Sequence, residues 1–308
     1  MGTTITINKT KEILNERQAR LYDQVYPASA VHFLSFSQVE IDGHSHPMTR
    51  SAQRLFAQKL QVPTDYLSRC PEYLQEVNLN YWIRSLGKTP LFIRFDEDKV
   101  RAAFSTRYKP IDHKDIAARL GEVFPEDKEV EFSLSDELLL IRAIDHQRGF
   151  KTQGAGGDEI SPGVSIVNSE TGWSAFSIEA FFLRLVCTNG LITQTKVSNR
   201  IRHIRENALE EFSQSINLIS LEAEQIQEKF RLSLDQRADN PLATISTFNR
   251  RFGLTKKEEE LVTLAWDGGN TMFSIINAYT GAANGPGLPL EVSYKLQRVG
   301  GIILSLVR

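Results

Sequence analysis

The stretch LFIRFDEDKVRAAF, residues 91–104, decides the fold class. Two runs of β-branched and aromatic residues, Leu91–Phe95 and Val100–Phe104, lie on either side of the acidic segment Asp96-Glu97-Asp98. Two such runs joined by a short polar segment are typical of a β-hairpin. Parallel strands need a crossover of a dozen or more residues, so this connection predicts antiparallel strands.

Further strand-like runs surround this hairpin. Leu138–Ile144 and Val164–Val167 follow it, and a helical segment near Lys114–Val123 interrupts the series. Before it, Ala30–Phe36 and Gln38–Ile41 also favour strands, and Asp42-Gly43 then gives a turn signal. The sequence therefore predicts a mainly antiparallel central sheet with inserted helices.

Helical patterns lie on both sides of the predicted sheet. Thr49 is a candidate N-cap, and Pro63 and Pro71 indicate the starts of two further helices. We expect the helix after Pro71 to turn four apolar residues toward a core, namely Leu74, Val77, Tyr81 and Trp82. After Asn240-Pro241, helical segments are expected around Leu254–Trp266 and Pro289–Leu306. These elements predict an α+β fold.

A long amphipathic helix is expected over residues 199–235. Apolar residues recur at spacings of three and four along it and form one seam, made of Phe212, Ile216, Ile219, Ala223, Ile226 and Phe230. This seam packs either on the protein's own sheet or on a second subunit, which would make the protein a homo-oligomer. The helix begins the last of three expected regions, 1–88, 89–198 and 199–308, which can also form one single domain.

Composition excludes several classes of protein. The chain has 308 residues, of which 41% are hydrophobic and 24% charged, so it can fold around a core. Its net charge of −2 excludes a histone-like polybasic binder. Two cysteines cannot form a disulfide scaffold or a four-cysteine zinc site. The first residues lack the apolar core of a signal peptide, and the apolar runs are too short to span a bilayer, so we expect a cytoplasmic protein without membrane contact.

Candidate catalytic residues are few. Cys187, near His203 in sequence, is either a nucleophile or a small buried hydrophobe among apolar neighbours. Asp42, His44 and His46 alternate, so on a strand they would share a face and could bind a metal, but the Asp42-Gly43 turn favours a solvated loop. We therefore predict no catalytic residue, metal or cofactor, and an enzyme using either group remains the alternative.

The distribution of charge is more informative than its sum. Residues 180–205 contain five basic residues and no acidic one, namely Arg184, Lys196, Arg200, Arg202 and Arg205. A local concentration of cations can bind a polyanion, and the backbone N–H groups of a helix starting near Arg200 would favour phosphate. The same residues can instead form an ordinary face of salt bridges with acids one helical turn along.

A second basic segment covers residues 81–114, with eight basic residues against four acidic ones and several aromatic residues between them. Arg107-Tyr108-Lys109 combines charges that neutralise phosphates with a ring that can stack on a base. The predicted nucleic-acid-binding residues are therefore Arg107, Lys109, Arg184, Lys196, Arg200, Arg202, His203 and Arg205.

Two segments carry a resemblance to a known family. Residues 162–172 (PGVSIVNSETG) and 184–190 (RLVCTNG) resemble the linked motifs of phage- and plasmid-borne proteins grouped as domain of unknown function 932. Other segments agree in the same order: Tyr108-Lys109-Pro110-Ile111, Arg202-His203 before a long helix, Asn277-Ala278-Tyr279-Thr280 and Leu296–Gly301. The resemblance covers roughly residues 50–305, and it departs from the family pattern at Ile204, where a threonine is expected after the histidine.

The resemblance implies a context of mobile elements in the bacterial cytoplasm. Together with the two basic segments, it leads to the hypothesis of a non-enzymatic nucleic-acid-binding protein, with single-stranded DNA as the favoured partner. Such a protein would act as a single-strand annealing or recombination accessory. The alternatives are the enzyme already described and an interaction protein that modulates a host factor.

Overall fold

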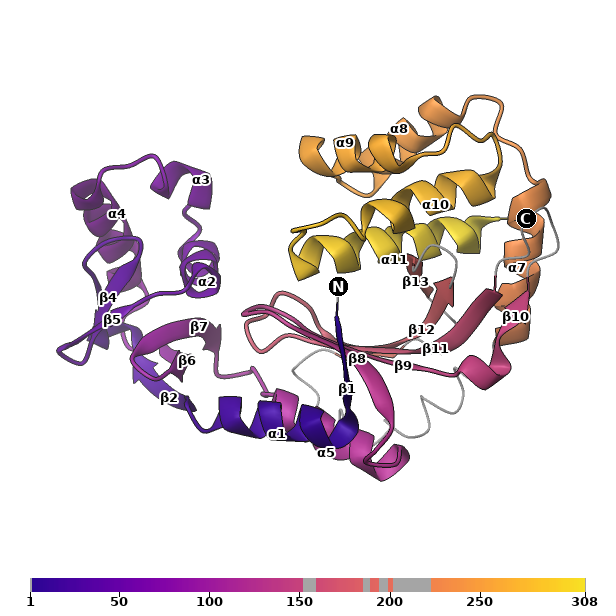
Figure 1. Cartoon of the computed structure of the whole chain (residues 1–308). Helices are drawn as coiled ribbons and strands as arrows, with labels where there is room; N and C mark the ends of the chain where they lie inside the picture. Colours follow the sequence, from indigo (N-terminus) through magenta and orange to yellow (C-terminus); the bar gives the residue numbers. More distant parts are fainter. Residues whose placement is uncertain (1, 152–158, 185–188, 194–198, 202–222, 308) are drawn as a thin grey trace.

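The structure is a computed structural model that describes residues 2–151, 159–184, 189–193, 199–201 and 223–307. Figure 1 shows a body, built on the largest sheet and its covering helices, and a small lobe made of residues 21–105. Helices and antiparallel sheets make up both parts, so the predicted α+β class is confirmed.

The body contains an eight-stranded sheet with the order β1-β8-β9-β11-β12-β13, in which β10 also pairs with β11 and β14 with β12. Every one of these pairings is antiparallel, as predicted. The strands are β1 Thr3–Thr6, β8 Glu129–Leu134, β9 Leu139–Ile144, β10 Phe150–Lys151, β11 Glu159–Asn168, β12 Phe176–Arg184, β13 Asn189–Thr193 and β14 Asn199–Ile201.

Helices cover both faces of this sheet. Figure 1 shows α10 and α11 on one face and α1 and α5 on the other. The helices of the body are α1 Ile7–Gln18, α5 His113–Val123, α7 Ala223–Asp235, α8 Pro241–Arg251, α9 Lys256–Ala265, α10 Met272–Ala282 and α11 Leu290–Leu306, with a 3-10 turn η2 at His146–Arg148. Local capping explains two of the helix starts. Asn240 accepts the backbone N–H of Ala243 ahead of Pro241, and Thr255 forms a capping box with Glu258.

The small lobe contains two three-stranded antiparallel sheets. One is β2 Leu21–Pro27, β6 Pro90–Asp96 and β7 Lys99–Ser105; the other is β3 Val31–Phe33, β4 Gln38–Ile41 and β5 His44–Pro47. The hairpin predicted at residues 91–104 is β6–β7, and Glu97 in its turn has φ of 54°. The remaining elements are η1 Ala28–Ala30, α2 Arg50–Leu60, α3 Thr64–Leu67 and α4 Glu72–Ser85. Thr49 caps α2, as predicted.

The expected orientation of α4 is wrong. Val77, Tyr81 and Trp82 were expected in a core, but 62%, 67% and 45% of their surfaces are exposed. The helix instead buries Leu79, Asn80 and Ile83. The side chain of Asn80 accepts the N–H of Phe33 and donates to its carbonyl oxygen, both at 2.8 Å, so it satisfies the backbone of β3 and fixes which face of α4 turns inward.

The expected long helix is only partly described. Residues 199–201 form β14, not the start of a helix, because they pair with Phe176–Ile178 of β12. Residues 202–222, with the first half of the seam, lie outside the described residues. In α7, Ile226 and Phe230 are buried in the protein's own core, and the Phe230 ring lies 6.1 Å from that of Phe182. No described helix combines the length and the apolar character that crossing a bilayer requires.

Candidate functional site

Four nearly fully buried polar side chains form a cluster between the small lobe and the body, which we name the buried ionic centre. It consists of Arg94 on β6, Arg101 on β7, His113 at the start of α5 and Glu170 after β11. Charged groups are seldom buried unless they are paired and hydrogen-bonded, so each of these needs an identified partner. The partners join segments that are far apart in sequence.

Glu170 is held from two elements. Its Oε2 accepts from Arg101 Nη1 at 3.1 Å, and its Oε1 accepts the backbone N–H of His113 at 2.9 Å. That N–H belongs to the first residue of α5, where helical N–H groups lack intrahelical partners and favour an anion. Burial alone would raise the pKa of Glu170, but His113, Arg101 and Arg94 outweigh burial and lower it to about 2.

His113 is neutral at pH 7. Burial lowers its pKa to about 4, and the adjacent carboxylate of Glu170 offsets only part of that effect. Asn168 Nδ2 lies 3.2 Å from His113 Nδ1, which assigns Nδ1 as the acceptor and leaves the ring proton on Nε2, 3.6 Å from Glu170 Oε2. Because both residues are buried, they are placed to support structure and not to reach a substrate.

Arg94 connects the centre to the loop that follows β7. Its Nε donates to Asp23 Oδ1 at 2.8 Å and its Nη2 to Asp112 Oδ1 at 2.5 Å, while Nη1 lies 3.5 Å from the hydroxyl of Tyr108. Burial raises the pKa of Tyr108, and Arg94 offsets only part of the effect, so Tyr108 is an uncharged phenol. The ring of Phe104 stacks on it with centroids 4.0 Å apart.

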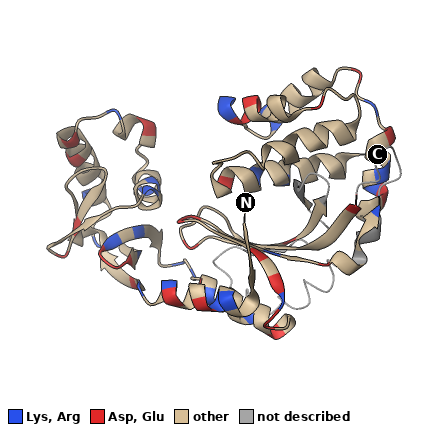
Figure 2. Ribbon diagram, viewed as in Figure 1, with Lys and Arg blue, Asp and Glu red and all other residues tan. Residues whose placement is uncertain are grey.

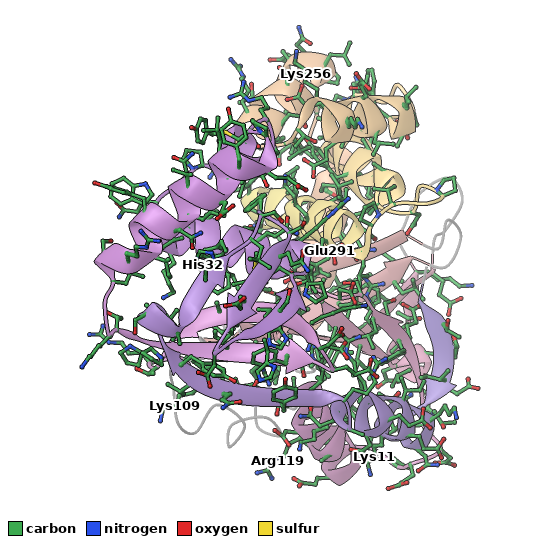
Figure 3. All side chains as sticks on the ribbon, turned by 90° about the vertical axis from the view of Figure 1, so that its left-hand side faces the viewer. Lys11, His32, Lys109, Arg119, Lys256 and Glu291 are labelled. Carbon is green, nitrogen blue, oxygen red and sulfur yellow. The ribbon has the colours of Figure 1, made fainter. Side chains whose placement is uncertain are left out.

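These contacts anchor the segment 105–112, which we name the basic loop. Tyr108 is held by Phe104 and Arg94, and the carbonyl of Ile111 accepts from Asn168 Nδ2 at 2.8 Å. Arg107 and Lys109, on either side of Tyr108, are exposed, and Figure 3 shows Lys109 at the surface. The buried ionic centre therefore presents two cations on a fixed backbone. Positive and negative residues are otherwise interspersed over the described ribbon (Figure 2), so this local arrangement matters more than net charge.

The structure separates the other predicted residues that it describes. Arg200 lies in β14 opposite Ser177, whereas Arg184 ends β12. Seven positions of an extended strand separate Ser177 from Arg184, roughly 23 Å. Ser177 also pairs with Val167, near the end of β11 that leads to Glu170, so the backbone of Arg200 lies at the same end of the sheet as the buried ionic centre. The side chains of Arg184 and Arg200 are not described, and Lys196, Arg202, His203 and Arg205 lie outside the described residues.

The enzyme alternative depends on Cys187 or on the group Asp42, His44 and His46. Cys187 lies outside the described residues. His44 and His46 are on β5, which pairs with β4, so the expected loop is wrong for these two residues; Asp42 is in the preceding turn with φ of 54°. His46 Nδ1 lies 2.8 Å from the carbonyl oxygen of Asp98. Within the described ranges, no group of three or more His, Cys, Asp or Glu residues is arranged to hold a metal ion.

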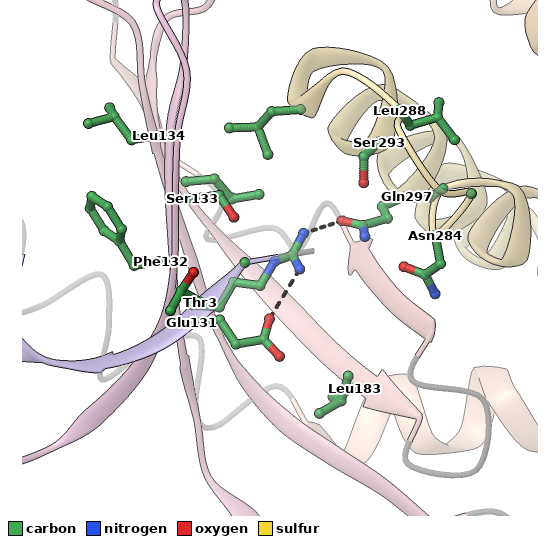
Figure 4. A pocket seen from close by; sticks show the side chains of 16 residues that line it. Thr3, Glu131, Phe132, Ser133, Leu134, Leu183, Asn284, Leu288, Ser293 and Gln297 are labelled. Atoms are coloured by element: carbon green, nitrogen blue, oxygen red, sulfur yellow. Dashed lines mark hydrogen bonds and ion pairs between the residues drawn. The ribbon is translucent and has the colours of Figure 1, made fainter.

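A cavity of about 540 Å³ lies between the sheet and α11, and the sequence did not indicate it. Arg142 of β9 spans it, with Nη1 3.2 Å from Glu131 Oε2 and Nη2 bonded to Gln297 Oε1; Figure 4 shows both partners. Its guanidinium also lies over the ring of Phe181, 4.5 Å from the centroid. Arg142 and Glu131 are the charged residues among the described lining residues, and their charges are opposite. The cavity therefore suits an uncharged molecule better than a phosphate.

Sequence signals for the buried residues existed in retrospect. Arg94, Arg101 and Arg142 each stand alone in an otherwise apolar strand-like run, which is the pattern of a buried and paired charge. Glu170 and Gln297 lie in two of the segments that resemble the known family. The sequence identified Glu170 only as part of a family motif. Its partners, Arg101 and the backbone N–H of His113, are evident only from the fold.

The fold and these contacts define an α+β protein whose antiparallel sheet is joined to a small lobe by a buried ionic centre. The family model described as "Domain of unknown function (DUF932)" matches residues 101–284, more than half of the chain. The chain belongs to this family, and the predicted resemblance is confirmed. The matched range begins at Arg101 and contains His113 and Glu170. No curated protein and no solved structure matches the chain.

Proposed function

We propose that this protein is a non-enzymatic nucleic-acid-binding protein that binds single-stranded DNA through the basic loop. A role as an annealing or recombination accessory of the phage or plasmid type, in the cytoplasm, follows from the same proposal. The observation that carries it is the anchored basic loop, where Arg107 and Lys109 are exposed on either side of a tyrosine that Arg94 and Phe104 hold in place.

A fixed loop favours binding for an energetic reason. Ordering a flexible loop at an interface costs free energy that opposes association, whereas a loop anchored in the free protein avoids much of that cost. Cations on such a loop neutralise phosphates and release counterions, which is the main sequence-independent contribution to nucleic-acid binding. The position of β14 supports the proposal further, because it places the backbone of Arg200 at the same end of the sheet as the buried ionic centre.

The proposal includes a homo-oligomer formed through the Phe212–Phe230 seam. Ile226 and Phe230 are buried in the protein's own core and are not available for a second subunit. Assembly through the seam would therefore use its earlier positions Phe212, Ile216 and Ile219, which lie outside the described residues. Annealing proteins act on long single strands, and an oligomer would multiply the number of basic loops per strand.

The test is fluorescence anisotropy with a labelled oligothymidylate at about 0.1 M salt. Each phosphate contact on a single strand releases about 0.7 counterion, which corresponds to about five-fold in affinity at this salt concentration. R107A/K109A should therefore weaken binding about 25-fold. The control is K256A/K257A on α9, which removes the same charge; Figure 3 shows Lys256 far from Lys109. No binding by the wild type at low salt, or an equal loss in the control, would overturn the proposal.

A further inference from the structure

Helix α4 carries an exposed aromatic face, which we name the α4 face. Tyr73, Val77 and Tyr81 are spaced by four residues and so lie on one side of the helix. Their surfaces are 65%, 62% and 67% exposed. Trp82 lies about 100° around the helix from Tyr81, at the edge of this face. Its half-exposed ring has a centroid 5.1 Å from that of Tyr81 in an edge-to-face arrangement. Contiguous exposed apolar surface of this kind marks an interaction site more often than chance.

The α4 face is not needed to hold the small lobe together. The helix packs through Leu79, Asn80 and Ile83, on the side toward β3 and α2. Figure 1 shows α4 on the outer side of the small lobe, away from the eight-stranded sheet. Its aromatic residues therefore face solvent in the single chain.

The charges on α4 favour an anionic partner. At about 100° per residue, Arg84 lies about 20° from Val77 and about 60° from Tyr81 around the helix, so it belongs to the α4 face. Lys88 is exposed in the turn that follows. The acidic residues Glu72 and Glu76 lie to one side of the stripe, and Glu76 Oε1 is 3.9 Å from His32 Nε2.

The α4 face combines aromatic rings with cations, and the acidic residues of the helix lie outside it. This combination matches one partner chemistry better than others. Single-stranded DNA offers flat bases that stack on aromatic side chains and phosphates that pair with Arg and Lys. A second copy of the same face would instead bring Arg84 and Lys88 of both copies together with no acid within the stripe to pair with them. An acidic peptide would supply the charge but not the rings.

We infer that the α4 face is a stacking platform for the unpaired bases of single-stranded DNA, with Tyr73 and Tyr81 under the bases, Trp82 at the edge beside Tyr81, and Arg84 and Lys88 at the phosphates. The inference rests on the proposed function and adds a distinct requirement. The basic loop needs only phosphates, whereas the α4 face needs bases. The two contributions can therefore be separated with an oligonucleotide that has a backbone but no bases.

The experiment compares an oligothymidylate with an abasic oligodeoxynucleotide of the same length, using the full chain. The wild type should bind the oligothymidylate more tightly. Y73A/Y81A should weaken that binding about 25-fold or more, because each stacked base contributes about five-fold or more, and should leave the abasic affinity unchanged. R107A/K109A should weaken both. The control L242A/L264A removes two exposed apolar side chains from α8 and α9 and should change neither.

Trp82 gives a second and direct measurement. In a variant carrying Trp173→Phe and Trp266→Phe, Trp82 is the remaining tryptophan, and oligothymidylate should quench its emission while the abasic strand should not. If the wild type binds both strands equally and Y73A/Y81A changes neither affinity, the inference is overturned and the proposed function stands. If Y73A/Y81A changes a dimer to a monomer by light scattering without affecting DNA, the α4 face is a contact between copies. If the wild type binds neither strand, both proposals fail.

Discussion

Acidification from pH 7 to pH 4 should destabilise the folded protein by charging His113 inside the buried ionic centre. The ring is nearly fully buried, and its pKa falls from an ordinary value of 6.5 to about 4 in the folded state. Arg94, Arg101 and Arg17 all oppose a positive charge there, while Glu170 favours it. Burial together with the three guanidinium groups outweighs the single carboxylate.

The sign and size of the effect follow from these two pKa values. Between pH 6.5 and pH 4 the unfolded chain binds a proton at this residue and the folded chain does not, so the free energy of unfolding rises with pH across that window. The contribution is fully present above pH 6.5 and is lost as the pH falls toward 4. A pKa difference of about 2.5 corresponds to about 3 kcal/mol, at 1.36 kcal/mol for each pH unit.

Urea unfolding of the wild type and of H113N at pH 7, 5 and 4 measures this contribution. Asparagine has no titratable group, so the loss of stability between pH 7 and pH 4 should be about 3 kcal/mol smaller in H113N. Equal losses in the two proteins would refute the reasoning. If H113N does not fold, NMR titration of the wild type decides the matter, because a His113 resonance that titrates near pH 6.5 contradicts a buried neutral ring.

Three further predictions concern other parts of the structure. E170Q should cost about 3–5 kcal/mol in urea unfolding because it leaves Arg101 buried without a carboxylate, and adding R101M should recover part of that loss; additive losses would contradict the pairing. G163A should cost about 1–3 kcal/mol, since the new Cβ would lie 2.4 Å from the carbonyl oxygen of Ala143, and unchanged stability would contradict this strand register. I219D should dissociate the oligomer in light scattering, and a wild type that is already monomeric at micromolar concentration would show that the seam is only intramolecular.

Local signals made much of the fold predictable. The β6–β7 hairpin follows from two apolar runs around a three-residue polar turn, and the start of α2 follows from Thr49 as N-cap. Helix α8 was not predicted, although Asn240 caps it in the same way. Each of these signals acts between residues that are close in sequence. They specify where an element begins or turns, but not which face of it meets the rest of the protein.

Long-range contacts explain what the sequence did not reveal. The apolar spacing of Tyr73, Val77 and Tyr81 is the same whether the stripe meets a core or solvent. In the fold, the other side of α4 packs inward through Leu79, Ile83 and Asn80, which bonds to the backbone of Phe33. Likewise, Asn199–Ile201 is a strand because β12 offers it a pairing edge. The local spacing of apolar residues carries no information about Phe33 or β12, which are distant in sequence. The orientation of α4 and the strand at Asn199–Ile201 therefore depend on tertiary structure.

The residues of the candidate site were likewise predicted only in part. Arg107 and Lys109 were predicted from charge and an intervening aromatic residue, and the structure places both at the surface. The residues that hold their loop were not predicted, because Arg94, Asp23 and Asp112 meet only after β2, β6 and the start of α5 come together.

The salt dependence of single-stranded DNA binding tests the central claim most directly. Log K for an oligothymidylate, plotted against log salt, should fall linearly for the wild type, and R107A/K109A should make the slope shallower by about 1.4, from about 0.7 for each lost phosphate contact. K256A/K257A should keep the slope of the wild type. An unchanged slope in R107A/K109A, or no binding by the wild type at low salt, would contradict a phosphate-binding role for the basic loop.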